Sequence, residues 1–81
     1  MTHDEALQKL QTIFDGLFLS PVKLTPALTA EEVPEWDSLM QINLVIAIEK
    51  AFAVRFRVGE VEKTKNVGEF IDLILRRKDG A

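Results

Sequence analysis

The chain has 81 residues, of which 47% are hydrophobic and 28% charged, and it contains no cysteine and one histidine. This length and composition predict a single folded domain, residues 1–81. The missing cysteines exclude disulfides, thiolate metal sites and a catalytic thiol from the chain itself. The lone histidine, His3, lies near a terminus and supports neither a serine–histidine constellation nor a metal site.

The net charge is −3, and the acids and bases are unevenly distributed. Residues 1–37 hold seven acids and two bases, whereas residues 38–81 hold six acids and eight bases. This weak charge does not suggest nucleic-acid binding. The longest apolar stretch, 42–48, is too short to span a bilayer, and the N-terminus lacks the pattern of a signal peptide. We expect a cytoplasmic monomer that binds no nucleic acid and has no membrane span.

A first helix is predicted over residues 2–19. Thr2 and Glu5 have the spacing of a capping box, and Ser20-Pro21 ends the helix because a residue before proline avoids the helical region. The apolar residues of this segment recur at steps of three and four and predict one buried face: Leu7, Leu10, Phe14 and Leu17.

A long connection follows over residues 21–36 and contains all three prolines. Connections of this length are often functional. A short turn is expected within residues 28–34, with Thr29 and Glu32 as a small capping box. The apolar residues expected to hold the connection on the core are Val22, Leu24, Leu28 and Val33.

The second helix is predicted from about Ser38 to Ala53, and it is apolar around much of its circumference. Leu44, Ile48 and Phe52 form one stripe, which we expect in the core, and Ile42 and Ile46 form another to one side. Such a helix is either central or exposes apolar surface to a partner.

Residues 54–58 alternate apolar and basic side chains, which is a strand pattern, but no second strand pattern is available to pair with it. We therefore expect a loop with a short helical turn near residues 59–62. The last helix is expected to start at Asn66, with Glu69 as its capping-box glutamate, and to end near Gly80.

Ser38 has two interpretations. It is a favoured N-cap, and with Gln41 it matches the capping-box spacing. Asp37, one residue earlier, is an equally good cap. If Asp37 caps the helix, the Ser38 hydroxyl is exposed at the helix N-terminus, where the helix dipole favours a phosphate. The residues alone leave both interpretations open.

The stretch "WDSLMQINLVIAIEKAF" resembles the core motif of acyl carrier proteins, in which Asp-Ser-Leu opens the second helix. Leu44, Glu49 and Phe52 match the family's apolar, acidic and aromatic positions, and the similarity covers essentially the whole chain. The resemblance implies an all-α, four-helix bundle with three long helices, one short helix and a long first loop. It also implies that Ser38 is esterified with 4′-phosphopantetheine taken from coenzyme A.

The function that the resemblance implies is that of a carrier, not an enzyme. The thiol of the arm would carry acyl groups as thioesters to the enzymes of fatty acid, polyketide or other specialised acyl metabolism. The expected partners are a phosphopantetheinyl transferase, which contacts Asp37, and acyl-loading and acyl-processing enzymes. Leu39, Ile42 and Ile46 would form the docking surface, although Leu39 suits core packing equally well.

Two features depart from the family pattern. Trp36 stands where many members have a small residue, and it serves either as a core aromatic closing the loop or as a wall beside the arm. Met40, Gln41 and Asn43 replace the acids usual in fatty-acid-synthesis carriers, which favours a stand-alone carrier of a specialised pathway. The alternatives are a peptidyl or aminoacyl carrier, or an unmodified helical interaction module in which Ser38 is only a cap.

Overall fold

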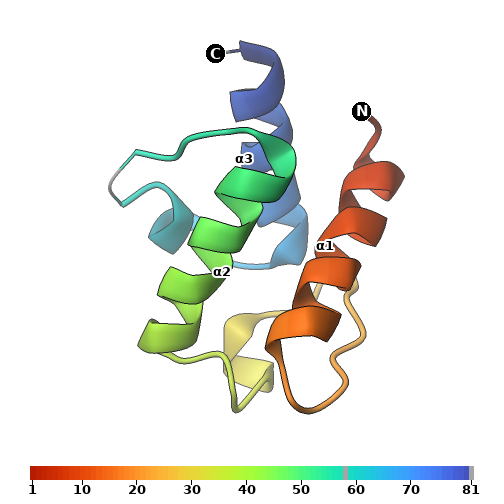
Figure 1. Cartoon of the computed structure of the whole chain (residues 1–81), viewed down its shortest axis with the longest axis vertical. Helices are drawn as coiled ribbons and strands as arrows, with labels where there is room; N and C mark the ends of the chain where they lie inside the picture. The colour runs from red at the N-terminus through yellow and green to blue at the C-terminus, as the bar shows by residue number, and fades with distance from the viewer. Residues whose placement is uncertain (58, 81) are drawn as a thin grey trace.

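The computed structural model describes residues 1–57 and 59–80 and contains three α-helices, α1 (His3–Leu17), α2 (Ser38–Phe52) and α3 (Val67–Gly80). Two short 3₁₀ turns, η1 (Ala30–Glu32) and η2 (Val61–Lys63), lie in the connections. Figure 1 shows α1 and α2 side by side, α3 behind them, and the first connection crossing one end of the bundle. The all-α prediction is confirmed, and the short fourth helix is present as 3₁₀ turns.

The N-terminus of α1 forms the predicted capping box. Thr2 Oγ1 accepts a hydrogen bond from the Glu5 N–H at 3.2 Å, and the Glu5 carboxylate accepts one from the Thr2 N–H at 2.8 Å. The helix ends at Leu17, two residues before the predicted end, because Phe18 takes an extended conformation. This conformation lets the Phe18 ring stack on Phe14, with the ring centroids 4.7 Å apart.

The core is formed by one face of each helix. Of the face predicted for α1, Leu10 and Phe14 are buried and Leu7 and Leu17 are half-buried, while Ala6 is buried as well. Leu44 and Ile48 of α2 are fully buried, and Phe52 is 1% exposed. Burial of a side chain of this size stabilises the fold by about 1.5–3 kcal/mol. The other large, fully buried side chains come from α1 and α3: Leu10, Phe14, Val67, Phe70, Ile71 and Ile74.

The first connection is fixed to α1 by a side-chain amide. Gln11 Nε2 donates to the Val22 carbonyl at 2.6 Å, and Gln11 Oε1 accepts from the Leu24 N–H at 2.9 Å. Of the predicted anchors, Leu24 and Val33 are buried, and Val22 and Leu28 are half-buried. These contacts hold an irregular segment in one place.

The start of α3 contacts the same connection. The Val67 N–H donates to the Leu28 carbonyl and the Gly68 N–H to the Pro26 carbonyl, both at 2.9 Å. A Cβ at Gly68 would lie only 3.1 Å from the Pro26 oxygen, so glycine permits this approach. Asn66 Oδ1 accepts from the Glu69 N–H, so Asn66 caps α3 as predicted, but the Glu69 carboxylate accepts from the Lys65 N–H rather than from the Asn66 N–H that a capping box requires. The predicted cap at Thr29 is wrong, since its side chain makes no capping hydrogen bond in η1.

The segment after α2 is a loop, as predicted, although its side chains alternate. Ala53 ends the helix in the left-handed region at φ 56°. Val54 is buried and Phe56 packs near Phe70, whereas Arg55 is exposed. The expected turn is η2, slightly later than predicted, and Val58 lies outside the described residues.

Candidate functional site

Asp37, not Ser38, caps α2. Asp37 has an extended backbone, and its carboxylate accepts a hydrogen bond from the Met40 N–H at 2.8 Å. Ser38 is consequently the first helical residue, and it is exposed. The capping box of Ser38 with Gln41 is therefore wrong. The Asp37 carboxylate accepts the capping hydrogen bond, and the Gln41 amide oxygen accepts one from the Trp36 indole N–H.

The exposed hydroxyl lies at the positive end of the α2 dipole. Within residues 1–57 and 59–80, no protein acceptor is bonded to the backbone N–H of Ser38 or Leu39. Backbone N–H groups at a helix start favour a negatively charged group nearby. The position thus suits a serine that bears a phosphoester.

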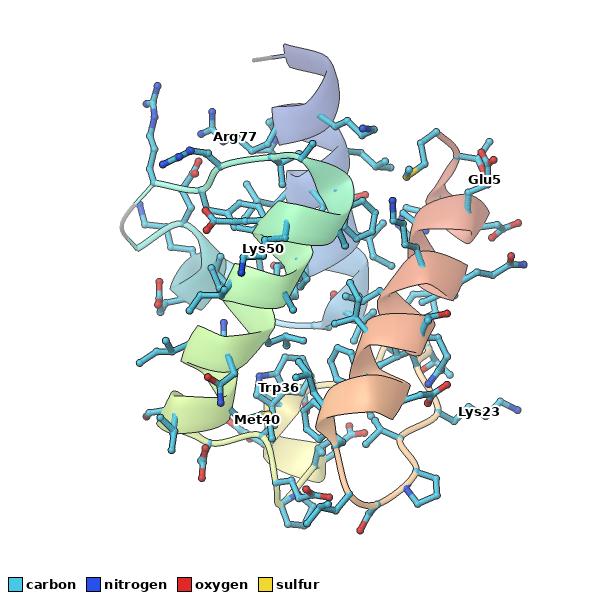
Figure 2. The ribbon with its side chains drawn as sticks, viewed as in Figure 1. Glu5, Lys23, Trp36, Met40, Lys50 and Arg77 are labelled. Atoms are coloured by element: carbon cyan, nitrogen blue, oxygen red, sulfur yellow. The ribbon has the colours of Figure 1, made fainter. Side chains whose placement is uncertain are left out.

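Trp36 joins the loop before Ser38 to two helices. Its Nε1–H donates to Gln41 Oε1 at 2.5 Å, and its ring meets Phe14 edge-on with centroids 5.1 Å apart. Figure 2 shows Trp36 between the N-terminal end of α2 and α1, close to Met40. Trp36 is half-buried, so it closes the loop onto the core and still faces the site.

A hollow adjoins Ser38 and continues into the space beside α2. It is lined by Ser38, Trp36 and Gln41 together with Ala30, Asp37, Ile42 and Glu62. A second hollow shares Ala30, Trp36, Gln41 and Glu62 with the first and extends to Phe70 at the start of α3. The two hollows therefore adjoin each other at Trp36 and Gln41.

Glu35 positions the loop that precedes Ser38, and sequence reasoning missed it. Its carboxylate accepts hydrogen bonds from the N–H groups of Ser20, at 2.7 Å, and Leu19, at 3.0 Å. These two bonds, with Ser20 first, lower the pKa of Glu35 below its usual value. No short-range spacing could reveal this contact, because the partners are 15 and 16 residues apart.

The three predicted docking residues lie on the surface of α2. Leu39 is 68%, Ile42 58% and Ile46 47% exposed. Core packing, the second interpretation of Leu39, is therefore wrong. Apolar side chains that recur along one exposed face are typical of an interaction surface.

Among the described residues, no helix is long and apolar enough to cross a membrane. The same part of the chain contains no group of three histidine, cysteine, aspartate or glutamate side chains able to hold a metal ion.

Two curated proteins are similar to this chain over almost its whole length. One, named "Acyl carrier protein", from Thermosynechococcus vestitus, is 35% identical over 75 residues, which cover 91% of this chain and 93% of the relative. Another of the same name, from Rubrobacter xylanophilus, is 33% identical over 79 residues, covering 96% and 98%. No family model matches the chain.

A solved structure has a similar fold. It is the solution NMR structure of a holo acyl carrier protein from Geobacter metallireducens, with a TM-score of 0.72 and 32% sequence identity. The match covers 94% of this chain and 84% of that one.

Proposed function

This chain belongs to the acyl carrier protein family, whose members are carriers rather than enzymes. On that premise we propose that it carries acyl groups as thioesters on a 4′-phosphopantetheine arm attached to Ser38. The observation that carries the proposal is the division of roles at the start of α2. Asp37 caps the helix, and the Ser38 hydroxyl remains exposed beside a hollow.

The residues present fit such a group. The backbone N–H groups at the start of α2 stabilise a phosphodiester anion on Ser38. The hollow that Ser38 lines with Trp36 and Gln41 offers space beside the attachment point. When bound, the arm supplies the thiol that the chain lacks, since it contains no cysteine. The family relatives and the holo form of the Geobacter protein support this assignment.

The partners of such a carrier are a phosphopantetheinyl transferase and enzymes that load or process the acyl group. We assign Asp37 to the transferase contact and Leu39, Ile42 and Ile46 to docking, because the three apolar residues are exposed on the helix that Ser38 opens. The first turn of α2 carries no acid, which favours enzymes of a specialised acyl pathway over those of general fatty acid synthesis. The compartment that we propose is the cytoplasm.

A second candidate is an interaction module that never carries the arm. The exposed apolar face of α2 favours it equally, because that face needs no prosthetic group to bind a partner. A thiol assay separates the two candidates, since the chain itself has no cysteine. After incubation with coenzyme A and a promiscuous transferase, followed by removal of coenzyme A, a carrier gives one thiol per chain. A folded chain that gives none is the module.

A further inference from the structure

One face of α2 is apolar in its middle and positively charged at the end away from Ser38. Leu39, Ile42 and Ile46 follow one another at steps of three and four, and the next step of four reaches Lys50. All four side chains are exposed. Figure 2 shows Lys50 projecting from the side of α2 that faces away from α3. The apolar face thus ends in a cation.

The segment after α2 brings two more cations to the same end. Glu49 Oε2 accepts a hydrogen bond from the Phe56 N–H at 3.0 Å, which holds this segment against the last turn of α2. Arg55 and Arg57, on either side of Phe56, are exposed. Lys78 also lies there, and its Nζ donates to the Phe52 carbonyl at 3.2 Å.

Acids near this face either lie beside Ser38 or are already bonded at the far end, where the Glu60 carboxylate accepts hydrogen bonds from the Arg57 N–H and from the Arg77 side chain. Glu49 is the only acid of α2, and its half-buried carboxylate is already bonded to Phe56. Asp37 caps the helix beside Ser38, and Glu62 lines the hollow next to Ser38 and Ile42. Two carboxylates therefore lie near Ser38. Cations outnumber acids at the other end of α2, where four basic side chains, Lys50, Arg55, Arg57 and Lys78, face two acids, Glu49 and Glu60.

We propose that the enzymes served by this carrier bind α2 with an apolar strip and an acidic patch on the enzyme surface. The strip contacts Leu39, Ile42 and Ile46, and the patch contacts the cations at the C-terminal end of α2. The proposal rests on the proposed function for the nature of the partner. Ser38 and Lys50 are separated by about 18 Å along the helix, at 1.5 Å per residue. The acidic patch accordingly lies at about this distance from the entrance that receives the Ser38 arm. Charge complementarity of this kind orients the encounter and disfavours a partner with a basic patch there.

The test uses a purified carrier-dependent enzyme whose docking patch is rich in lysine and arginine. In a second version, two of the basic residues facing the far end of α2 are replaced by glutamate. Binding of both versions is measured at low salt with the unloaded and the loaded chain. We expect the acidic version to bind roughly fivefold more tightly, since each exposed charge pair contributes modestly. Added salt should reduce this preference.

Two carrier variants complete the test. The double variant Lys50→Glu, Arg55→Glu should reverse the preference, whereas Lys23→Glu should leave it unchanged. Lys23 is an exposed lysine of the first connection, and Figure 2 shows it beyond α1, on the side of the molecule away from α2. Circular dichroism verifies that the variants fold.

Tighter binding of the wild-type chain to the basic enzyme would overturn the proposal. So would a double variant that behaves like Lys23→Glu. Since binding is also measured without the arm, failure of Ser38 to accept the arm would refute the proposed function and leave the docking result interpretable.

Discussion

The carboxylate of Asp37 lies 2.8 Å from the backbone nitrogen of Met40, and this hydrogen bond caps α2. Capping and the candidate attachment site consequently belong to two adjacent residues. Ser38 can change without loss of the cap, and Asp37 can fix the helix start without using the hydroxyl.

The first prediction concerns stability at this junction. Asp37→Ala should lower the free energy of unfolding by about 1 kcal/mol, because it removes the cap. Ser38→Ala should change it by less than about 0.5 kcal/mol, because Ser38 is exposed and makes no capping bond. Urea unfolding of the two variants measures both values. A Ser38→Ala variant as unstable as Asp37→Ala would show that the hydroxyl contributes to the cap.

The second prediction concerns the core stripe of α2. Phe52→Ala should cost about 3–5 kcal/mol, a large part of the stability of a small domain, because the Phe52 side chain is 1% exposed. Leu39→Ala on the same helix is the matched control, and it should stay within about 0.5 kcal/mol of wild type. Thermal and urea unfolding give both values. Equal melting temperatures for the two variants would contradict the assigned core.

The third prediction concerns pH and Glu35. The N–H groups of Ser20 and then Leu19 stabilise the charged carboxylate and lower its pKa from the usual 4.5. A lowered folded-state pKa stabilises the fold above the unfolded value, and this contribution is lost as the pH falls through the folded value. The stability advantage of wild type over Glu35→Gln should therefore be largest near neutral pH and shrink below about pH 4.5. An advantage that stays constant in urea unfolding across this range would argue against the two hydrogen bonds.

The fourth prediction uses Trp36 as a reporter, because it is the only tryptophan of the chain. Trp36 and Ser38 line the same hollow, so attachment of the arm should change the environment of the indole. The fluorescence emission should shift when the wild-type chain is loaded. Ser38→Ala, treated in the same way, should show no shift. An unchanged spectrum in a fully loaded wild-type chain would place the arm away from this hollow.

Much of the fold follows from local patterns in the sequence. The cap of α1 and the stripe of Leu44, Ile48 and Phe52 depend on residues within one or two turns of each other, so spacing reveals them. The choice between Asp37 and Ser38 as the cap of α2 needed the structure. Aspartate and serine are both good caps. Only the backbone geometry shows that the Asp37 side chain faces the Met40 N–H.

The contacts that hold the loops could not be predicted in this way. Gln11 reaches the first connection 11 and 13 residues along the chain. Glu60 pairs with Arg77, 17 residues away on α3. Such partners are chosen by tertiary packing, and one sequence gives no spacing rule for them. The loop around Phe56 could be predicted, since no second strand pattern was available to pair with it, but its anchor, the hydrogen bond from the Phe56 N–H to Glu49, needed the structure.

The most direct test of the central claim is the mass of the intact protein after incubation with coenzyme A and a promiscuous phosphopantetheinyl transferase. We predict that wild type gains one phosphopantetheine, that Ser38→Ala gains none, and that Ser20→Ala gains one, since Ser20 is the only other serine. Peptide mapping should place the group on Ser38. A folded wild-type chain that gains no mass, or a Ser38→Ala variant that still gains one group, would contradict the claim that Ser38 carries the arm.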